Sequence, residues 1–268
     1  MKIKKFGNLE IRVFNNFEEL SKAAAEIFAT ECKKTLGAKE IFTVSLCGGS
    51  TPHRLFELLA GEFKNNIHWP AVHIFWGDER EKKENPESNF QIAYKIWLEK
   101  MSKEIPFFKN NKFLFRPEIN NIHRIKIELG LVESAKEYEK EINKFAPEGF
   151  DLSFNGAGSD GHRNGVFPEN PKINWKNEIW DLPESVKVYG YRVPPEINPH
   201  QERITLTPWF LNKSKVNILM LSGKDKADLL KKITLVKEKF NKRDLPAITF
   251  NDVPTIVLAD KAAASKII

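Results

Sequence analysis

The chain has 268 residues, 41% hydrophobic and 29% charged, which is typical of a globular protein with a sizeable core. Its net charge is +6, but the Lys residues are spread along the chain without a long basic tract, which argues against a nucleic-acid partner and at most favours an anionic substrate. No stretch approaches the roughly 20 apolar residues of a membrane span, and the first residues lack the apolar core of a secretory signal, so we expect no membrane partner and a cytoplasmic location.

Short β-rich runs alternate with helical patterns, which predicts a doubly wound α/β fold with a mostly parallel sheet and helices on both faces. The expected elements begin with a helix over 17–36 capped by Asn16, a strand over 41–46, a helix over 51–59 with Pro52 in its first turn, a strand over 72–76, and helices over 88–98 and 132–145. They continue with strands over 150–154, 186–191 and 216–221, a helix over 224–233 and a strand over 255–258. The segment 168–199, rich in Pro, Asn and Trp, is expected to be irregular. No change of composition marks a boundary, so residues 1–268 are expected to form a single domain.

The first candidate site follows the strand expected over 41–46. Gly48 and Gly49 allow a tight turn and a close approach of the backbone to a ligand. Ser50 and Thr51 add hydroxyl groups, and the start of the next helix offers N–H groups and a partial positive charge. The loop is therefore suited to a phosphate group, although an ordinary capped strand-to-helix turn explains it equally well. It has neither a P-loop Lys nor a GxGxxG pattern, so it does not indicate a nucleotide.

Asp78, Glu79 and Arg80 form the second candidate site, at the end of the strand expected over 72–76. Ligands of open α/β sheets bind at the carboxyl ends of strands. Three consecutive side chains cannot all point into one site, however, and a solvated turn is the simpler interpretation of these residues alone.

The third candidate site is the segment 155–162, which places three glycines around Asp160 and His162 after an expected strand. The glycines allow a backbone path that brings both side chains to a cleft. Histidine titrates near neutral pH, so His162 is suited to act as a general base. The other five histidines lack such a setting and are interpreted as surface or packing residues.

The fourth candidate site combines Arg203, in the segment 203–207, with Lys226, which follows the strand expected over 216–221. An Arg and a Lys on separate loops could hold a phosphate from two sides. Each residue alone is more typical of a surface charge.

The two cysteines, Cys32 and Cys47, fall in different expected elements, without a CxxC pattern or a Cys/His cluster. A disulfide framework and a structural zinc site are therefore not expected. Two buried or half-buried free thiols in a reducing compartment are the interpretation we favour.

Taken in order, these segments resemble the 6-phosphogluconolactonase family, which shares its fold with the glucosamine-6-phosphate deaminases. The resemblance extends over most of the chain, and although each segment is weak alone, the ordered set is specific. It is carried by GGSTP at 48–52, DER at 78–80, Ser88-Asn89-Phe90, Ile122-His123-Arg124-Ile125, the helix with Ala135, Tyr138 and Glu139, DGH at 160–162 with Phe167-Pro168, RITLT at 203–207 and Leu245-Pro246-Ala247.

The resemblance implies a sugar-phosphate-binding domain that hydrolyses 6-phospho-D-glucono-1,5-lactone in the oxidative pentose phosphate pathway, without a metal or an organic cofactor. It further implies that His162 is a general base, that Asp160 orients its imidazole and that Arg80 steadies developing negative charge. The substrate and its phosphate would be held by Gly48, Gly49, Ser50, Thr51, Asp78, Arg203 and Lys226. We expect a monomer or a homodimer.

The chain departs from the family pattern directly after His162. The family usually has Thr-Ala-Ser-Leu-Phe-Pro there, whereas this chain has Arg-Asn-Gly-Val-Phe-Pro at 163–168, and Ala157 and Ser159 stand where Met and Pro are usual. Three outcomes are open for Arg163: a contact with the phosphate, a changed substrate, or a projection into solvent.

Three alternative functions were weighed. A deaminase uses a Glu five residues after the His and a DEY pattern, where this chain has Phe167 and Arg80, so the lactonase is favoured. The second alternative, a sugar-phosphate-binding protein with weak catalysis, is supported only by the altered segment 163–165. A nucleic-acid-binding protein rests only on the basic charge.

Overall fold

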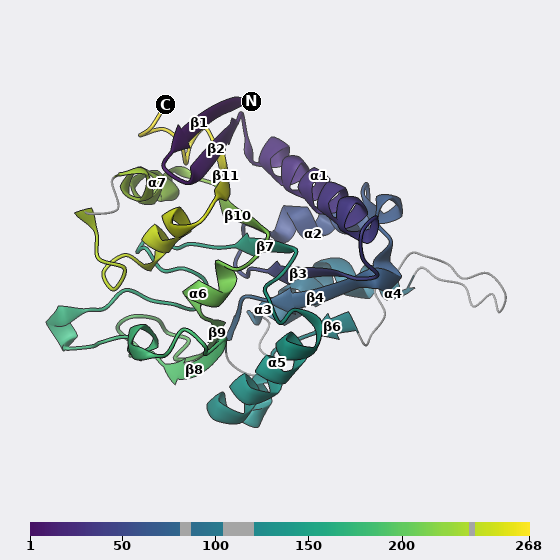
Figure 1. Cartoon of the computed structure of the whole chain (residues 1–268). Coiled ribbons are helices and arrows are strands. Elements are labelled where there is room, and N and C mark those ends of the chain that lie inside the picture. The colour runs from purple at the N-terminus through teal and green to yellow at the C-terminus, as the bar shows by residue number, and fades with distance from the viewer. Residues whose placement is uncertain (81–86, 104–120, 236–238) are drawn as a thin grey trace.

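The computed structural model describes residues 1–80, 87–103, 121–235 and 239–268 (Figure 1). Within them, a central sheet has the strand order β1-β2-β11-β10-β7-β3-β4-β6. The strands are β1 (Lys2–Phe6), β2 (Leu9–Phe14), β3 (Phe42–Leu46), β4 (Val72–Trp76), β6 (Ile122–His123), β7 (Leu152–Asn155), β10 (Val216–Leu221) and β11 (Thr255–Asp260). Neighbours run parallel except β1 and β2, which form an antiparallel hairpin. The expected mostly parallel sheet is confirmed.

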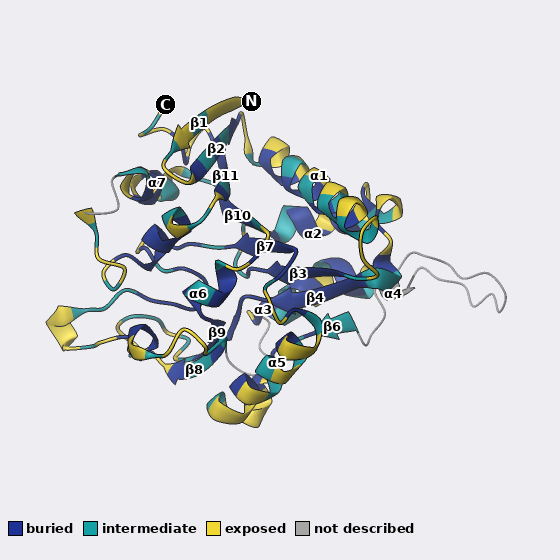
Figure 2. Cartoon of the chain, in the orientation of Figure 1, coloured by how far each residue is buried: buried dark blue, intermediate teal, exposed yellow. Residues whose placement is uncertain are grey.

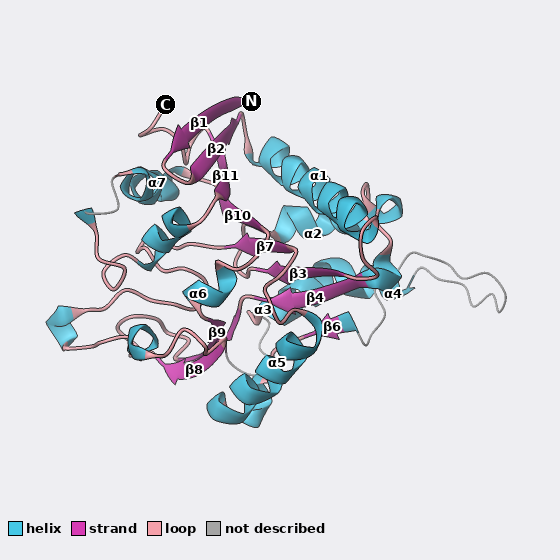
Figure 3. Cartoon of the chain, in the orientation of Figure 1, coloured by secondary structure: helices cyan, strands magenta, loops and turns pink. Residues whose placement is uncertain are grey.

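Helices cover both faces of this sheet (Figure 3). Phe28 of α1 (Phe17–Leu36) packs edge-on against Phe42, with ring centroids 5.6 Å apart. Tyr138 of α5 (Leu131–Phe145) packs against Phe75 and hydrogen-bonds both backbone groups of Trp76. In the register of β3 and β4, Phe75 is aligned with Ser45, and neighbouring side chains of a strand alternate between faces. Phe42 and Phe75 therefore point to opposite faces, and α1 and α5 lie on opposite sides.

Helix α1 forms where the sequence predicts it. The side chain of Asn16 accepts a hydrogen bond from the N–H of Glu19, and acidic residues in the first turn and lysines in the last turn complement the helix dipole. Leu20, Ala24 and Phe28 recur at four-residue spacing, and each is fully buried against the sheet (Figure 2). The helix therefore has both a capped start and one apolar face.

The remaining helices are α2 (His53–Ala60), α3 (Asn89–Ala93), α4 (Glu99–Lys103), α6 (Pro208–Leu211) and α7 (Ala227–Thr234). Among them, α4 and α6 were not expected, and the others differ from expectation mainly at their ends. The helix expected over 88–98 is α3 followed by a π-helical stretch over Tyr94–Leu98, and the one expected from residue 224 begins with a single 3-10 turn. The segment 168–199 contains two short 3-10 turns and one strand, which the sequence had partly indicated.

A second, three-stranded antiparallel sheet was not expected. Its order is β5 (Asp78–Arg80), β9 (Glu202–Leu206) and β8 (Val188–Arg192). β5 was interpreted as a turn because it has three polar residues, and β9 was noted only as a motif. Their pairing aligns Arg80 with Arg203 and Asp78 with Thr205. Two candidate sites far apart in the sequence are thus hydrogen-bonded to each other.

Cys32 and Cys47 are both buried free thiols, as expected. Burial raises the pKa of each to about 12. Among the described residues, no helix has the length and apolar character needed to span a membrane.

Candidate active site

A cavity of about 330 Å³ opens where β3, β4, β7 and β10 end. The candidate residues expected from the sequence line it, except Asp160, which contacts His162, and Glu79, which points away. The lining comprises Cys47, Gly48, Gly49, Ser50, Thr51, Asp78, Arg80, Asn89, Gly156, Ala157, Gly158, His162, Asn164, Phe167, Asn198, Arg203, Met220, Ser222, Asp225 and Lys226. The four candidate sites are therefore parts of one site.

The glycine loop closes one side of the cavity, between β3 and α2. Gly49 has φ +79°, which favours glycine, and a Cβ at Gly48 would lie 1.8 Å from the side-chain oxygen of Asn89. Helix α2 has no side-chain cap, so the hydroxyl groups of Ser50 and Thr51 are not used to start the helix. The capped-turn interpretation of these residues is not supported, and their hydroxyl groups line the cavity.

The side chains of Asp78, Glu79 and Arg80 point alternately to the two sides of strand β5, as they do in any strand. Asp78 and Arg80 line the cavity, while Glu79 turns away and is buried. The Glu79 carboxylate accepts hydrogen bonds from the hydroxyl of Ser88 and from the backbone N–H groups of Arg80, Asn89 and Phe90. Burial raises the pKa of Glu79 to about 7 despite these bonds. Glu79 therefore anchors the start of α3.

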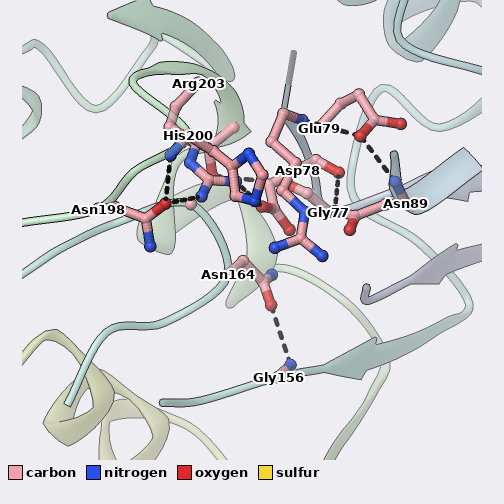
Figure 4. A network of polar contacts seen from close by, with 12 residues as sticks. Gly77, Asp78, Glu79, Asn89, Gly156, Asn164, Asn198, His200 and Arg203 are labelled. Atoms are coloured by element: carbon pink, nitrogen blue, oxygen red, sulfur yellow. Dashed lines mark hydrogen bonds and ion pairs between the residues drawn. The ribbon is translucent and has the colours of Figure 1, made fainter. Parts of the chain in front are cut away.

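Asp78 and Arg203 face each other in the cavity wall, with 3.9 Å between Oδ2 and Nη1 (Figure 4). Arg203 also donates to the side-chain oxygen of Asn198 at 2.7 Å, and its guanidinium lies 5.2 Å from the ring centre of Phe167. Burial raises the pKa of Asp78, opposed by the charges of Arg203, Arg80 and His162. Among the described residues, the buried Nε–H of Arg203 has no hydrogen-bond partner.

His162 and Asp160 approach closely, with 2.7 Å between Nδ1 and the carboxylate Oδ1. The oxygen lies out of line with the ring N–H, so the contact between the two side chains is close but not an aligned hydrogen bond. Burial alone would raise the pKa of Asp160, but the neighbouring side chain and backbone N–H of His162 hold it below its usual value. A Cβ at Gly158 would lie 2.2 Å from Asp160 Oδ1 and 2.3 Å from the imidazole. Only glycine leaves room for this pair.

Arg163 neither projects into solvent nor lines the cavity, because its side chain is fully buried elsewhere in the protein. The third outcome open for it, a changed substrate, stays a prediction. Two of the residues that depart from the family pattern, Ala157 and Asn164, line the cavity, and Asn164 belongs to the altered segment after His162. Asn164 has φ 48°, and its side-chain oxygen accepts a hydrogen bond from the N–H of Gly156 at 3.0 Å (Figure 4).

Three amides, Asn89, Asn164 and Asn198, line the cavity but were not singled out as site residues by sequence reasoning. Asn89 donates to the backbone oxygen of Asp78, and Asn198 accepts from Arg203. The partners of Asn89 and Asn198 are Asp78 on β5 and Arg203 on β9. The pairing of these two strands would have indicated the two amides, but neither strand was expected.

The side chains that line the cavity favour acid–base chemistry over thiol chemistry. Cys47 lines the cavity, but its raised pKa keeps it a thiol at neutral pH, which makes it a poor nucleophile. Within the described ranges, no group of three His, Cys, Asp or Glu side chains is arranged to hold a metal ion.

Known proteins resemble the chain over most of its length. A family model described as glucosamine-6-phosphate isomerases/6-phosphogluconolactonase matches residues 15–257. A protein of Arabidopsis thaliana named probable 6-phosphogluconolactonase 5 is 31% identical over 95% of this chain and 97% of its own. The crystal structure of 6-phosphogluconolactonase from Thermotoga maritima is 25% identical, with a TM-score of 0.70 over 94% of this chain and 99% of that one. A monomeric glucosamine-6-phosphate deaminase, 19% identical, has the same fold, with a TM-score of 0.72 over 96% of this chain and 99% of its own.

Proposed function

Because this chain belongs to the glucosamine-6-phosphate isomerase/6-phosphogluconolactonase family, we propose that it hydrolyses 6-phospho-D-glucono-1,5-lactone to 6-phosphogluconate. The name of the similar Arabidopsis protein supports the lactone as substrate. The observation that carries the proposal is the cavity that joins His162 to the glycine loop and to three cationic side chains, those of Arg80, Arg203 and Lys226. A base and an anion-binding loop in one cavity match a substrate with an ester at one end and a phosphate at the other.

In the proposed reaction His162 is the general base. Its Nδ1 lies against Asp160, which leaves Nε2 to accept a proton from a water molecule as that water attacks the lactone carbonyl carbon. The carbonyl oxygen becomes an oxyanion, and Arg80, which lines the same cavity, stabilises its charge. When the intermediate collapses, the bond between the carbonyl carbon and the ring oxygen breaks. The proton held by His162 then passes to that ring oxygen, which becomes a hydroxyl group.

The phosphate is proposed to lie at the glycine loop. The first turn of α2 carries partial positive charge and no side-chain cap, which suits a bound anion. The side chain of Lys226 is 19% exposed, and its ammonium group contacts only Asp225, at 3.5 Å, among the ion pairs of the described residues. Binding the remote phosphate fixes the ring, so that a modest base is sufficient for an already reactive ester.

Deamination of glucosamine 6-phosphate is the competing activity, and the fold does not separate the two because the deaminase structure shares it. The position five residues after His162 separates them, since Phe167 stands there with its ring 5.0 Å from the imidazole and cannot transfer a proton. Ammonia release from glucosamine 6-phosphate at a rate above that of lactone hydrolysis would reverse this assignment.

The direct test generates the lactone in situ and compares its hydrolysis by the wild-type protein and by His162→Ala. We expect the wild type to exceed the spontaneous rate and the variant to lose about 100-fold or more in kcat. Wild-type hydrolysis no faster than the spontaneous rate would overturn the proposed function. Full activity of the variant would overturn the role of His162 alone.

A further inference from the structure

The peptide that carries His162 is attached on both sides to one turn near the end of the chain. Before His162, the backbone oxygen of Gly161 accepts a hydrogen bond of 2.9 Å from the N–H of Ala247. Gly161 has φ +96°, and a Cβ there would lie 2.5 Å from the side chain of Leu245. The Leu245-Pro246-Ala247 segment, so far without a role, thus packs directly on the loop that carries His162.

After His162, the side chain of Arg163 reaches the same turn. Its Nη1 donates to Thr249 Oγ1 at 3.0 Å and to Asn212 Oδ1 at 2.7 Å. Its guanidinium lies 4.2 Å from the ring centre of Phe250. Thr249 and Phe250 belong to the 3-10 turn Pro246–Asp252, which begins with the residues that hold Gly161.

The cost of this arrangement indicates a role beyond packing. Arg163 is fully buried and its hydrogen-bond partners are neutral. Its Nε and Nη2 are also buried, without a hydrogen-bond partner in the part of the chain that the structure describes. Burial lowers the pKa of Arg163 to about 9, opposed by the charge of Asp252. An apolar side chain of similar volume avoids this desolvation penalty. A guanidinium adds directional contacts to an amide, a hydroxyl and an aromatic face, which fix the position of the adjoining backbone.

We propose that Arg163 and the turn 245–250 form a clamp that fixes the backbone on both sides of His162 and thereby orients its imidazole toward the substrate. Arg163 is a positioning residue in this clamp, because it does not line the cavity and touches no substrate. The expected effect of the clamp on catalysis rests on the proposed function. The clamp itself is a property of the free protein and does not depend on that function.

The test compares Arg163→Met and Arg163→Lys with Arg12→Met, a matched control on β2, where Arg12 pairs only with Glu10 and lies outside the cavity. For folded protein, we expect kcat of Arg163→Met to fall roughly 10- to 100-fold with KM changed by less than about threefold. Arg163→Lys, which keeps a cation but not the fork of donors, should recover part of the loss. Arg12→Met should retain the wild-type kcat.

A second readout does not depend on activity. In protein labelled with ¹⁵N in its six histidines, the His162 resonances are assigned by their disappearance in His162→Ala. We expect Arg163→Met to shift and broaden these resonances, as an imidazole with several orientations does. If Arg163→Met does not fold, Thr249→Val removes one acceptor of the clamp and should produce a smaller shift in the same direction.

The two readouts separate the clamp from the proposed function. Moved resonances in a protein whose wild type lacks lactonase activity would support the clamp and overturn the function. Unmoved resonances together with an unchanged kcat would overturn the clamp and leave the function intact. A fall in kcat equal to that of Arg12→Met would also overturn the clamp, since it would reflect general destabilisation.

Discussion

Two buried aspartates lie near opposite ends of the central strands, and the charged and hydrogen-bonding partners of their carboxylates differ greatly. Asp151 directly precedes β7, where its carboxylate accepts hydrogen bonds of 2.9 and 3.0 Å from the N–H and hydroxyl of Thr43. Lys39 and Lys215 approach it at 2.7 and 3.0 Å. Asp78, after β4, has Arg203 no nearer than 3.9 Å. Correspondingly, the pKa of Asp151 is lowered, because its partners outweigh burial, whereas burial raises the pKa of Asp78.

The difference separates a charge that supports the fold from one that belongs to a site. At the amino-terminal end of the sheet, the carboxylate is compensated within the protein. At the carboxyl-terminal end, charges are buried around an open cavity with their compensation incomplete, and a polar substrate can supply the missing contacts. Substitutions at the first end should therefore change stability, and substitutions at the second should change catalysis or binding.

The largest expected effect on stability is that of Asp151→Ala. It leaves the N–H of Thr43 without its acceptor and removes both lysine contacts, so we expect the free energy of unfolding to fall by about 2–4 kcal/mol. Urea denaturation measures this loss, and kcat per folded molecule should not change. Asp228→Ala removes an exposed aspartate paired with Lys266 and should leave stability unchanged. An equal loss of stability in Asp151→Ala and Asp228→Ala would contradict the assignment of Asp151 to the support of the fold.

A second effect at the amino-terminal end depends on pH. His73 is buried against His123, with 2.9 Å between Nδ1 and Nε2, and His123 in turn contacts Glu141 at 2.8 Å. Burial, His123 and Lys144 lower the pKa of His73 to about 4, with Glu141 opposing them.

As the pH falls below about 6.5, the unfolded chain takes up this proton before the folded one does, so stability is lost between about pH 6.5 and 4. The loss between pH 7 and pH 5 should be smaller in His73→Phe than in the wild type by about 1–2 kcal/mol. Thermal or urea denaturation at both pH values measures it, with the exposed His68→Gln as control. An identical acid dependence in His73→Phe and wild type would show that the histidine pair does not govern it.

At the carboxyl-terminal end, Lys226→Met tests the proposed phosphate contact. We expect KM for the lactone to rise roughly 5- to 20-fold with little change in kcat, because the lysine binds a part of the substrate that does not react. Lys224→Met changes an exposed neighbour outside the cavity lining and should keep the wild-type KM. A fall in kcat with an unchanged KM would instead indicate that Lys226 acts in the chemical step rather than in binding the phosphate.

The smallest effect on stability should come from Asp78→Asn. The change removes the cost of burying a charged carboxylate but also the carboxylate that faces Arg203, so the two contributions oppose each other. We expect the free energy of unfolding to change by less than about 1 kcal/mol, with a clear loss of activity. A destabilisation as large as that of Asp151→Ala would place Asp78 among the residues that support the fold.

The sequence predicted what depends on local pattern. The apolar spacing and Asn16 cap of α1, the buried strands β3, β4, β7 and β10, and the family itself are confirmed. The small antiparallel sheet was missed because β5 is three polar residues whose strand character comes only from pairing with β9. The buried position of Arg163 was not among the outcomes expected for it, because Arg side chains are seldom fully buried and nothing local indicated Phe250 and Thr249 as its surroundings.

The pairing of β5 with β9 also bears on how the protein folds. The hydroxyl of Thr205 contacts the backbone oxygen of Gly77 across 128 residues of sequence. Closing so long a loop is entropically costly and comes late, whereas local helices such as α1 form early. A chain emerging from the ribosome therefore lacks a complete cavity until β9 and, after it, β10 and Lys226 have been synthesised. During refolding, lactonase activity should return more slowly than helical circular dichroism, which makes the reaction itself a reporter of the long-range contacts that complete the cavity.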